Sequence, residues 1–253
     1  MVYTNTRRKE VNETGDTKWS YSRVDTFKSC PRRYQYRYIN NYRTIPDQAP
    51  DNALYLGTAL HLGLEKGVEA AIDSYKSHYF MLTTEHYNEI IKLEQLIPKA
   101  KALIPDGQFE LKVDANGYVG YIDLIYQDWI IDFKYSNNRD NYLKSPQIHL
   151  YKYFVDRPIN RLSYLFIPKI SIRQKKTETI REFRERLYGE LEYAEPELVD
   201  VKYDFSKVKK WLDGVKAAKE AVEFPKNETR LCNWCNYEEF CLRGEDWTIE
   251  RDR

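Results

Sequence analysis

The pattern of apolar and polar positions predicts three neighbouring strands in the middle of the chain. Three runs rich in β-branched and aromatic residues follow one another closely, at 109–113, 120–126 and 129–135. Asn116-Gly117 lies between the first two runs, and this dipeptide favours a two-residue hairpin turn. Gln127 and Asp128 separate the second run from the third. The runs therefore predict three antiparallel strands joined by two tight turns.

The predicted register gathers acidic side chains on one face of these strands. If each turn holds two residues, antiparallel pairing places Asp123 opposite Asp132 and Glu110 opposite Asp123. Side chains alternate along a strand, so Lys134 shares the face of Asp132. The opposite, apolar face is expected to hold Ile122, Leu124, Ile131 and Phe133. The strands then have one apolar face and one face of three acids and a lysine.

Three adjacent acids repel one another, and a divalent cation would remove that cost. Carboxylate oxygens suit Mg²⁺ or Mn²⁺, and Lys134 could orient a water or stabilise negative charge that develops on phosphorus. This combination indicates metal-dependent phosphodiester hydrolysis. The alternative is a set of solvated acids on an exposed sheet face, each neutralised by a lysine. The choice depends on the register, because Gln-Asp is not a strongly preferred two-residue turn.

Helical spacing of apolar residues surrounds these strands on both sides. Helices are predicted at 20–38 with a break at Cys30-Pro31, at 54–75, at 84–103 with a break near Pro98, at 145–155 and at 205–222. Further strands are expected at 161–167 and 197–203. In the helix at 205–222, the residues expected to face inward are Val208, Leu212 and Val215. This order predicts an α/β fold with a mixed central sheet flanked by helices.

Composition limits the possible fold classes and locations of the protein but does not identify its function. With 253 residues it can bury one sizeable core, so one main domain is expected. The net charge of +1 gives no overall attraction for nucleic acid, so any basic groove must be local. There is no phosphate-binding P-loop sequence, no apolar run long enough for a membrane span and no secretory signal. The expected location is the cytoplasm.

Four cysteines in that compartment favour metal ligation or buried thiols over disulfides. Cys232, Cys235 and Cys241 follow one another at x2 and x5 spacing, and Cys30 stands about two hundred residues earlier. A shared site would join the N-terminal helices to the C-terminal segment. Four thiolates could hold zinc or an iron-sulfur cluster, although structural zinc sites usually come from paired knuckles. Incidental buried cysteines are the third possibility.

Three further residues are weak candidates individually and become candidates only together with the other motifs. His61 lies beside the apolar stripe of the helix predicted at 54–75, where a lone histidine is usually structural. Gln147 and Tyr151 are four residues apart on a helix, so they share a face and could both reach a substrate phosphate or an attacking water. Taken alone, the pair reads as a surface glutamine over a packed tyrosine.

Two basic stretches are candidate nucleic-acid surfaces. The first is a set of arginines beside aromatic residues: Arg32, Arg33 and Arg37 with Tyr34, Tyr36 and Tyr38. The second is the charge-dense stretch 170–193. The alternative for both is an ordinary helix with solvated basic side chains.

Together these motifs resemble the RecB-like branch of the PD-(D/E)XK nuclease superfamily. The matching motifs are Gly57-Thr-Ala-Leu-His61, Gly120-Tyr-Ile-Asp123, Asp132-Phe-Lys134, Gln147-x3-Tyr151, and Cys30 with Cys232-x2-Cys235-x5-Cys241. They span about residues 19–243 in the order found in that family. Within the branch, the chain looks most similar to iron-sulfur members: the CRISPR-associated exonuclease of the Cas-four type and the AddB nuclease domain.

The resemblance implies a restriction-endonuclease-like core that cleaves DNA with Mg²⁺ or Mn²⁺, as an exonuclease on single-stranded ends. It implies metal binding by His61, Asp123, Asp132 and the backbone carbonyl of Phe133, while Lys134 serves the attacking water. Gln147 and Tyr151 would position the substrate, and the four cysteines would hold a structural [4Fe-4S] cluster. Glu110 is added as a metal ligand from the strand register alone. Asp132 stands where many relatives have Glu, which the superfamily's name already allows.

The resemblance also divides the chain and indicates its partners. Residues 19–243 would form a single nuclease domain, with 54–168 as the catalytic core and 19–53 and 223–243 as an iron-sulfur lobe. Tails are expected at 1–18 and 244–253. The expected partner is DNA, in recombination, repair or CRISPR spacer processing, with a separate helicase, recombinase or CRISPR adaptation proteins. Two alternatives stay open: a DNA-end-binding subunit with weak or no cleavage, and a zinc-stapled nuclease acting on RNA.

Overall fold

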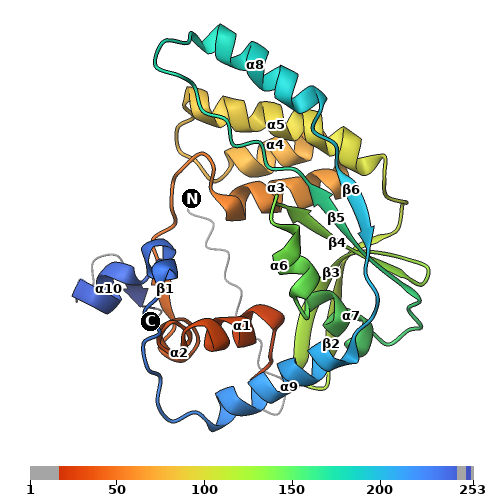
Figure 1. The fold of residues 1–253 in the computed structure, drawn as a ribbon, viewed down its shortest axis with the longest axis vertical. Helices are drawn as coiled ribbons and strands as arrows, with labels where there is room; N and C mark the ends of the chain where they lie inside the picture. Colours follow the sequence, from red (N-terminus) through yellow and green to blue (C-terminus); the bar gives the residue numbers. More distant parts are fainter. Residues whose placement is uncertain (1–16, 244–248, 252–253) are drawn as a thin grey trace.

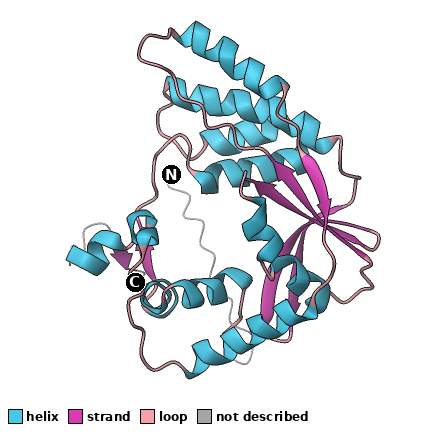
Figure 2. Ribbon diagram, in the orientation of Figure 1, coloured by secondary structure: helices cyan, strands magenta, loops and turns pink. Residues whose placement is uncertain are grey.

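The structure is a computed structural model that describes residues 17–243 and 249–251. Most of the tails expected at 1–18 and 244–253 therefore lies outside the described residues. Figure 1 shows the course of the chain, and Figure 2 shows the same view by secondary structure. None of the described helices is both long and apolar enough to cross a membrane.

A mixed five-stranded sheet forms the centre of the molecule and confirms the predicted α/β class. Its strands lie in sequence order: β2 (Gln108–Ala115), β3 (Tyr118–Tyr126), β4 (Trp129–Tyr135), β5 (Arg161–Ile167) and β6 (Glu197–Asp200). All neighbours are antiparallel except β4 and β5, which are parallel. Parallel strands need a crossover connection. Here it carries two helices, α6 (Arg139–Lys144) and α7 (Gln147–Phe154), of which α6 was not predicted.

Both tight turns have the predicted length. Ala115 pairs with Tyr118 and Tyr126 pairs with Trp129, so two residues separate the strands in each hairpin. Gln127 supplies the left-handed backbone that a tight hairpin needs, with φ of 51°, although glutamine seldom occupies such a position. The register on which the acidic cluster depends is therefore the predicted one.

Helices cover both faces of the sheet, as Figures 1 and 2 show. One layer contains α3 (Ala53–Lys66), α4 (Val68–Lys76), α5 (Thr84–Lys101) and α8 (Ile180–Glu192). The other contains α1 (Tyr21–Ser29), α7 and α9 (Phe205–Glu220). Each layer packs on the sheet through its own cluster of buried apolar side chains. The stretch after residue 170 thus contributes α8, whose bounds were not predicted, and the edge strand β6, which lies within the strand expected at 197–203.

Three helical details differ from the prediction. Gly67, with φ of 98°, divides the helix expected at 54–75 into α3 and α4. Pro98 does not break α5, because the fully buried Ala100 and the neighbouring apolar residues hold its last turn against the core. On α9, Trp211 faces inward in place of Leu212, which is 38% exposed. Positions 208, 211 and 215 fit the helical repeat as well as the predicted set.

The strand pair β2–β3 bends at Glu110 and Asp123, and this changes which side chains share a face. Phe109 pairs with Leu124, whereas the next recorded pair is Leu111 with Ile122. Glu110 between them has a left-handed backbone, with φ of 50°. As a result Ile122 packs in the cluster beneath α1, α7 and α9, while Leu124 packs beneath α3, α4 and α5. The prediction that Ile122 and Leu124 share one face was therefore wrong.

Segments from the two ends of the chain meet in a small lobe beside the sheet. The N-terminal part holds α2 (Pro31–Tyr34), a π-helix (Gln35–Ile39) and β1 (Tyr42–Thr44). The C-terminal part holds a 3₁₀ helix (Arg230–Trp234), α10 (Glu238–Arg243) and β7 (Ile249–Arg251). Strand β1 pairs with β7, and Tyr36 packs edge-on against Phe240 with ring centroids 5.1 Å apart. The lobe lies at the left of Figure 1.

Gly63 allows α3 to approach its neighbours closely, which gives a stability test. An alanine Cβ there would lie 2.5 Å from Ile97 Cδ1 and 2.8 Å from Ala71 Cβ. We expect Gly63→Ala to lower the free energy of unfolding by about 1–3 kcal/mol through overpacking. Gly189→Ala on α8 is the matched control, because its added Cβ meets no atom within 4 Å.

The control should leave stability unchanged or raise it by up to about 1 kcal/mol, since alanine favours a helix over glycine. Urea denaturation followed by circular dichroism measures both values. Equal effects of the two substitutions would contradict the close packing of α3.

Candidate active site

Four elements bring the candidate side chains to the bend of the sheet. His61 comes from α3, Glu110 from β2 and Asp123 from β3. Asp132 and Lys134 are two residues apart on β4, so they share one face. Helix α3 packs across β4, where the His61 ring meets the Phe133 ring at 81° with centroids 5.5 Å apart. This ring contact orients His61 toward Glu110 and Asp123.

His61, Glu110 and Asp123 form a group that could hold a metal ion. The His61 Nδ1 atom lies 3.3 Å from Asp123 Oδ1 and 3.9 Å from Glu110 Oε1. One ligand atom from each of the three lies within 4.8 Å of the others. Burial lowers the pKa of His61, but the two carboxylates outweigh burial and raise that pKa to about 10. Protonated His61 therefore balances the acids here and must lose its proton to bind a metal.

Asp123 explains why the strands bend where they do. Its Oδ2 atom accepts a hydrogen bond of 2.7 Å from the backbone N–H of Phe133. The recorded pairs between β3 and β4 end one step earlier, at Leu124 and Ile131. The Asp123 side chain thus accepts the hydrogen bond that the Phe133 N–H would otherwise donate to the backbone of the neighbouring strand. Burial raises the pKa of Asp123, whereas His61, Lys134 and this N–H lower it, with a net decrease that keeps the carboxylate ionised.

Asp132 is fully buried and forms an ion pair with Lys134. Burial raises the pKa of Asp132 to about 6, and the charge on Asp123 adds to the increase while Lys134 opposes it. Lys134 has its pKa lowered by burial and raised more strongly by Asp132 and Asp123, so it stays charged. A charged lysine can orient a water or neutralise an anion, but it cannot accept a proton.

Gln147 and Tyr151 form the predicted pair on α7. The Gln147 Nε2 atom donates a hydrogen bond of 2.9 Å to the Tyr151 hydroxyl. Tyr151 is 4% exposed, and burial together with the charge on Asp132 raises the pKa of its hydroxyl well above the usual range. The hydroxyl therefore keeps its proton and can donate it to a ligand. The Gln147 side-chain oxygen has no hydrogen-bond partner among the described residues.

The donor set suits Mg²⁺ or Mn²⁺. Carboxylate oxygens are the preferred ligands of these cations, and imidazole is acceptable to Mn²⁺. The Asp132 Oδ1 atom is buried and has no hydrogen-bond partner within the described part of the chain, as expected of an oxygen reserved for a cation. Of the predicted ligands, His61, Glu110 and Asp123 form the group described above. Asp132 lies outside that group and faces Lys134.

The superfamily model of PD-(D/E)XK nucleases matches residues 18–242, which includes every candidate residue named above. The chain belongs to the PD-(D/E)XK nuclease superfamily. These enzymes use divalent metals, in agreement with the His61, Glu110 and Asp123 group. No curated protein sequence matches the chain.

In this PD-(D/E)XK chain, two aromatic residues that lie beside Lys134 were not predicted from the sequence. The Lys134 Nζ atom lies 5.3 Å from the centre of the Tyr142 ring and 6.0 Å from that of Tyr164. Tyr142 belongs to the unpredicted α6, and Tyr164 lies beside Asp132 through the parallel pairing of β4 with β5. The chain carries no local signal for either placement, because parallel pairing links strands that are far apart in sequence.

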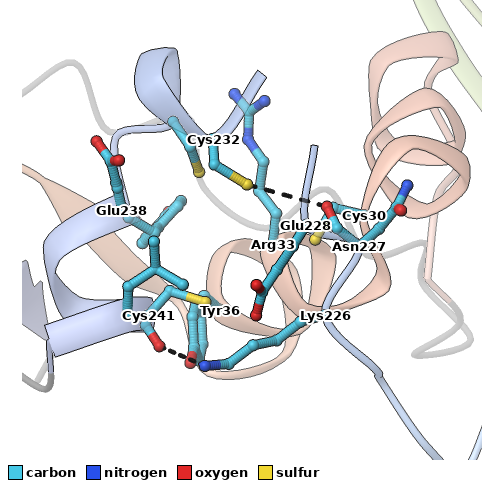
Figure 3. Close-up of a pocket in the computed structure, with 12 residues that line it drawn as sticks. Cys30, Arg33, Tyr36, Lys226, Asn227, Glu228, Cys232, Glu238 and Cys241 are labelled. Carbon is cyan, nitrogen blue, oxygen red and sulfur yellow. Dashed lines mark hydrogen bonds between the residues drawn. The ribbon is translucent and has the colours of Figure 1, made fainter. Parts of the chain in front are cut away.

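All four cysteines of the chain line one pocket between the two halves of the terminal lobe. Figure 3 shows Cys30, Cys232 and Cys241 around this pocket, with Arg33 and Lys226 among the lining residues. None of the four thiols forms a disulfide. Two hydrogen bonds hold the walls together, from Lys226 Nζ to the Cys241 carbonyl at 2.6 Å and from Asn227 Nδ2 to the Ser29 carbonyl at 2.7 Å. Cysteines from both ends of the chain thus converge as the sequence predicted.

The spread of the sulfur atoms distinguishes two possible occupants. Zinc bound by four thiolates, with bonds of about 2.3 Å, would hold its sulfurs about 3.8 Å apart. No three of the four sulfurs, all within the described chain, lie within 4.8 Å of one another. The sulfurs therefore stand farther apart than in an assembled zinc tetrahedron. The charged lining is mixed, with Arg33 and Lys226 beside Glu228 and Glu238.

The predicted arginine and tyrosine surface is used mainly for internal packing. Tyr34 is 3% exposed and stacks on Trp19, with ring centroids 6.4 Å apart. Tyr36 packs within the lobe, as described above. In the second basic stretch, Arg186 pairs with Glu178 and Arg184 donates to Asn88. For these residues, the structural interpretation explains the sequence better than nucleic-acid binding does.

Metal binding tests the geometry of the site independently of catalysis. We expect the protein to bind Mn²⁺, and Asp123→Asn to weaken that binding at least about tenfold because it removes a central charged oxygen ligand. Asp114→Asn is the control, since Asp114 is a carboxylate on β2 that pairs with Lys18 outside the site. Isothermal titration calorimetry measures all three affinities. Equal affinity in the protein and Asp123→Asn would contradict the site.

Proposed function

We propose that this protein is a metal-dependent DNA exonuclease that hydrolyses phosphodiester bonds at single-stranded ends. The observation that carries the proposal is the convergence of His61, Glu110 and Asp123 beside the buried Asp132–Lys134 pair. The superfamily supports nuclease chemistry. The preference for single-stranded ends and a role in recombination, repair or CRISPR spacer processing rest on the resemblance to RecB-like, iron-sulfur members.

The proposed role of each side chain in the site follows from its charge and its hydrogen-bonding groups. His61, Glu110, Asp123, Asp132 and the Phe133 carbonyl would hold the divalent cation. When bound, this cation supplies Lewis-acid polarisation of the phosphate and lowers the pKa of a bound water. The ammonium of Lys134 stabilises negative charge on the phosphate and orients the attacking water. Gln147 and Tyr151 fix the position of the substrate, because Tyr151 offers a proton to an oxygen and Gln147 offers a free carbonyl.

We further assign the cysteine pocket to a structural [4Fe-4S] cluster held by Cys30, Cys232, Cys235 and Cys241. Four convergent thiols and their wide spacing support this assignment over zinc. The cluster would join the terminal segments beside the nuclease core, within the predicted lobe of residues 19–53 and 223–243, of which α1 packs on the sheet. A small lobe buries too little apolar area to be stable alone, and a metal centre compensates for this.

Cleavage of end-labelled DNA tests the proposed activity. We expect metal-dependent release of label from single-stranded DNA, no release with a chelator, and at least a 100-fold loss in Asp132→Asn, roughly the effect of removing one electrostatic group. Asparagine removes the charge but keeps the shape of the buried side chain and an oxygen that can accept a hydrogen bond from Lys134, whereas alanine would remove both. Asp114→Asn should retain full activity.

The other outcomes separate the alternatives. Full activity in Asp132→Asn would refute the site assignment. Binding of DNA ends without cleavage, with Mn²⁺ present, would favour a DNA-end-binding subunit. Faster cleavage of RNA than of DNA would favour the ribonuclease alternative.

Metal analysis tests the cluster. Anaerobically purified protein should contain about four iron atoms per chain and absorb visible light. Cys235→Ala should lose iron and stability together, because metal binding is coupled to folding of the lobe. The control Trp234→Ala changes an exposed neighbour, 73% accessible, and should keep the iron. One zinc ion per chain, or a stable and colourless Cys235→Ala variant with full activity, would contradict the assignment.

A further inference from the structure

A polar pocket opens beside the candidate active site, and the proposed chemistry uses only one of its residues. It holds about 340 Å³ of open space, within the range of small-molecule sites. Four hydroxyl groups line it, from Tyr21, Ser136, Tyr142 and Ser145. Three amides complete the lining, from Asn138, Asn141 and Gln147. None of these side chains carries a charge at neutral pH.

The pocket adjoins the reaction centre at two points. Ser136 directly follows β4 and comes two residues after Lys134, which is a distance of about 7 Å along an extended chain. That distance equals about two nucleotide steps at the rise of about 3.4 Å in stacked DNA. Tyr142 connects the two sites through its ring beside Lys134, and Gln147 does so through its hydrogen bond to Tyr151.

The chemistry of the lining matches a nucleobase better than a phosphate. Phosphate sites in proteins use arginine, lysine or clustered backbone N–H groups, and no basic side chain lines this pocket. Unstacked bases are bound by amide and hydroxyl groups on their edges and by aromatic rings on their faces. Tyr21 and Tyr142 supply rings, and the three amides supply paired donors and acceptors.

Asn138 and Asn141 are exposed, and their side-chain amides have no hydrogen-bond partner among the described residues. They are therefore free to meet a ligand. Asn141 lies on the surface of α6, where its replacement by alanine disturbs no internal contact.

We infer that this pocket receives the unstacked base of a nucleotide next to the scissile phosphate. The inference rests on the proposed nuclease activity and adds the part of the substrate that the chain recognises. A paired base would first have to leave its duplex, at a cost of a few kcal/mol. The pocket, which is formed by α6 and the residues on either side of it, thus favours unpaired DNA.

Abasic scanning tests the inference. Single-stranded oligonucleotides carry one abasic residue at successive positions, and cleavage of each bond is timed for the wild type and Asn141→Ala. At one position beside the cleaved bond, removal of the base should slow the wild type about tenfold, which corresponds to about 1.4 kcal/mol. Asn141→Ala should cut intact DNA about fivefold more slowly than the wild type does. Both proteins should cut the abasic DNA at equal rates, because the group that Asn141 contacts is then absent.

The control is Lys144→Ala, an exposed change at the end of α6 outside the pocket. Loss of a backbone contact weakens all substrates equally, so this variant should keep the wild-type ratio between intact and abasic DNA. Equal slowing by Asn141→Ala on both substrates, or no abasic effect at any position, would overturn the pocket assignment alone. A wild type that cuts no DNA would overturn the proposed function as well.

Discussion

The clustering of like charges at the bend of the sheet is the constraint on which the rest of the structure depends. Glu110, Asp123 and Asp132 stand on three adjacent strands, and the two that are buried, Asp123 and Asp132, are costly unless paired. The chain meets this cost with two cations, since protonated His61 faces two acids and Lys134 faces the third. The backbone contributes as well, through the N–H that Phe133 donates to Asp123.

The bend links the charge cluster to the packing of both helical layers. Opposite Glu110 of β2, which has a left-handed backbone, apolar side chains of β3 before and after Asp123 enter different clusters. Such backbone strain persists only where the surrounding structure enforces it, and it is common at functional sites. The layer containing α3 supplies His61, and the opposite layer supplies Gln147 and Tyr151. The site therefore depends on both halves of the core.

Short-range signals made much of this fold predictable from the sequence. Turn residues set the two hairpins, and from them the register that places Glu110 and Asp123 side by side. The helical repeat found α1, α7 and α9. The metal group itself could be assembled only because His61 was recognised from its motif, since helix packing on a sheet leaves no local mark.

The features that sequence reasoning missed depend on long-range contacts or on exceptions to local rules. Strict alternation along β3 misplaced Ile122, because the recorded pairing with β2 is interrupted at Asp123, opposite Glu110 with its left-handed backbone. Proline is expected to end a helix, yet tertiary packing carries α5 past Pro98. Parallel pairing of β4 with β5 brings Tyr164 beside Asp132 and is invisible to any window along the chain. These three cases share one cause, which is that tertiary contacts override local preference.

Phosphorothioate substitution tests most directly whether the cation held at this bend acts on the scissile phosphate. One non-bridging oxygen of that phosphate is replaced by sulfur, and cleavage is timed in Mg²⁺ and in Mn²⁺. If the cation binds this oxygen, one of the two stereoisomers should be cut much more slowly in Mg²⁺, and Mn²⁺ should restore its cleavage, because sulfur is a poor ligand for the harder ion. Equal rates for both stereoisomers in both metals would contradict the account.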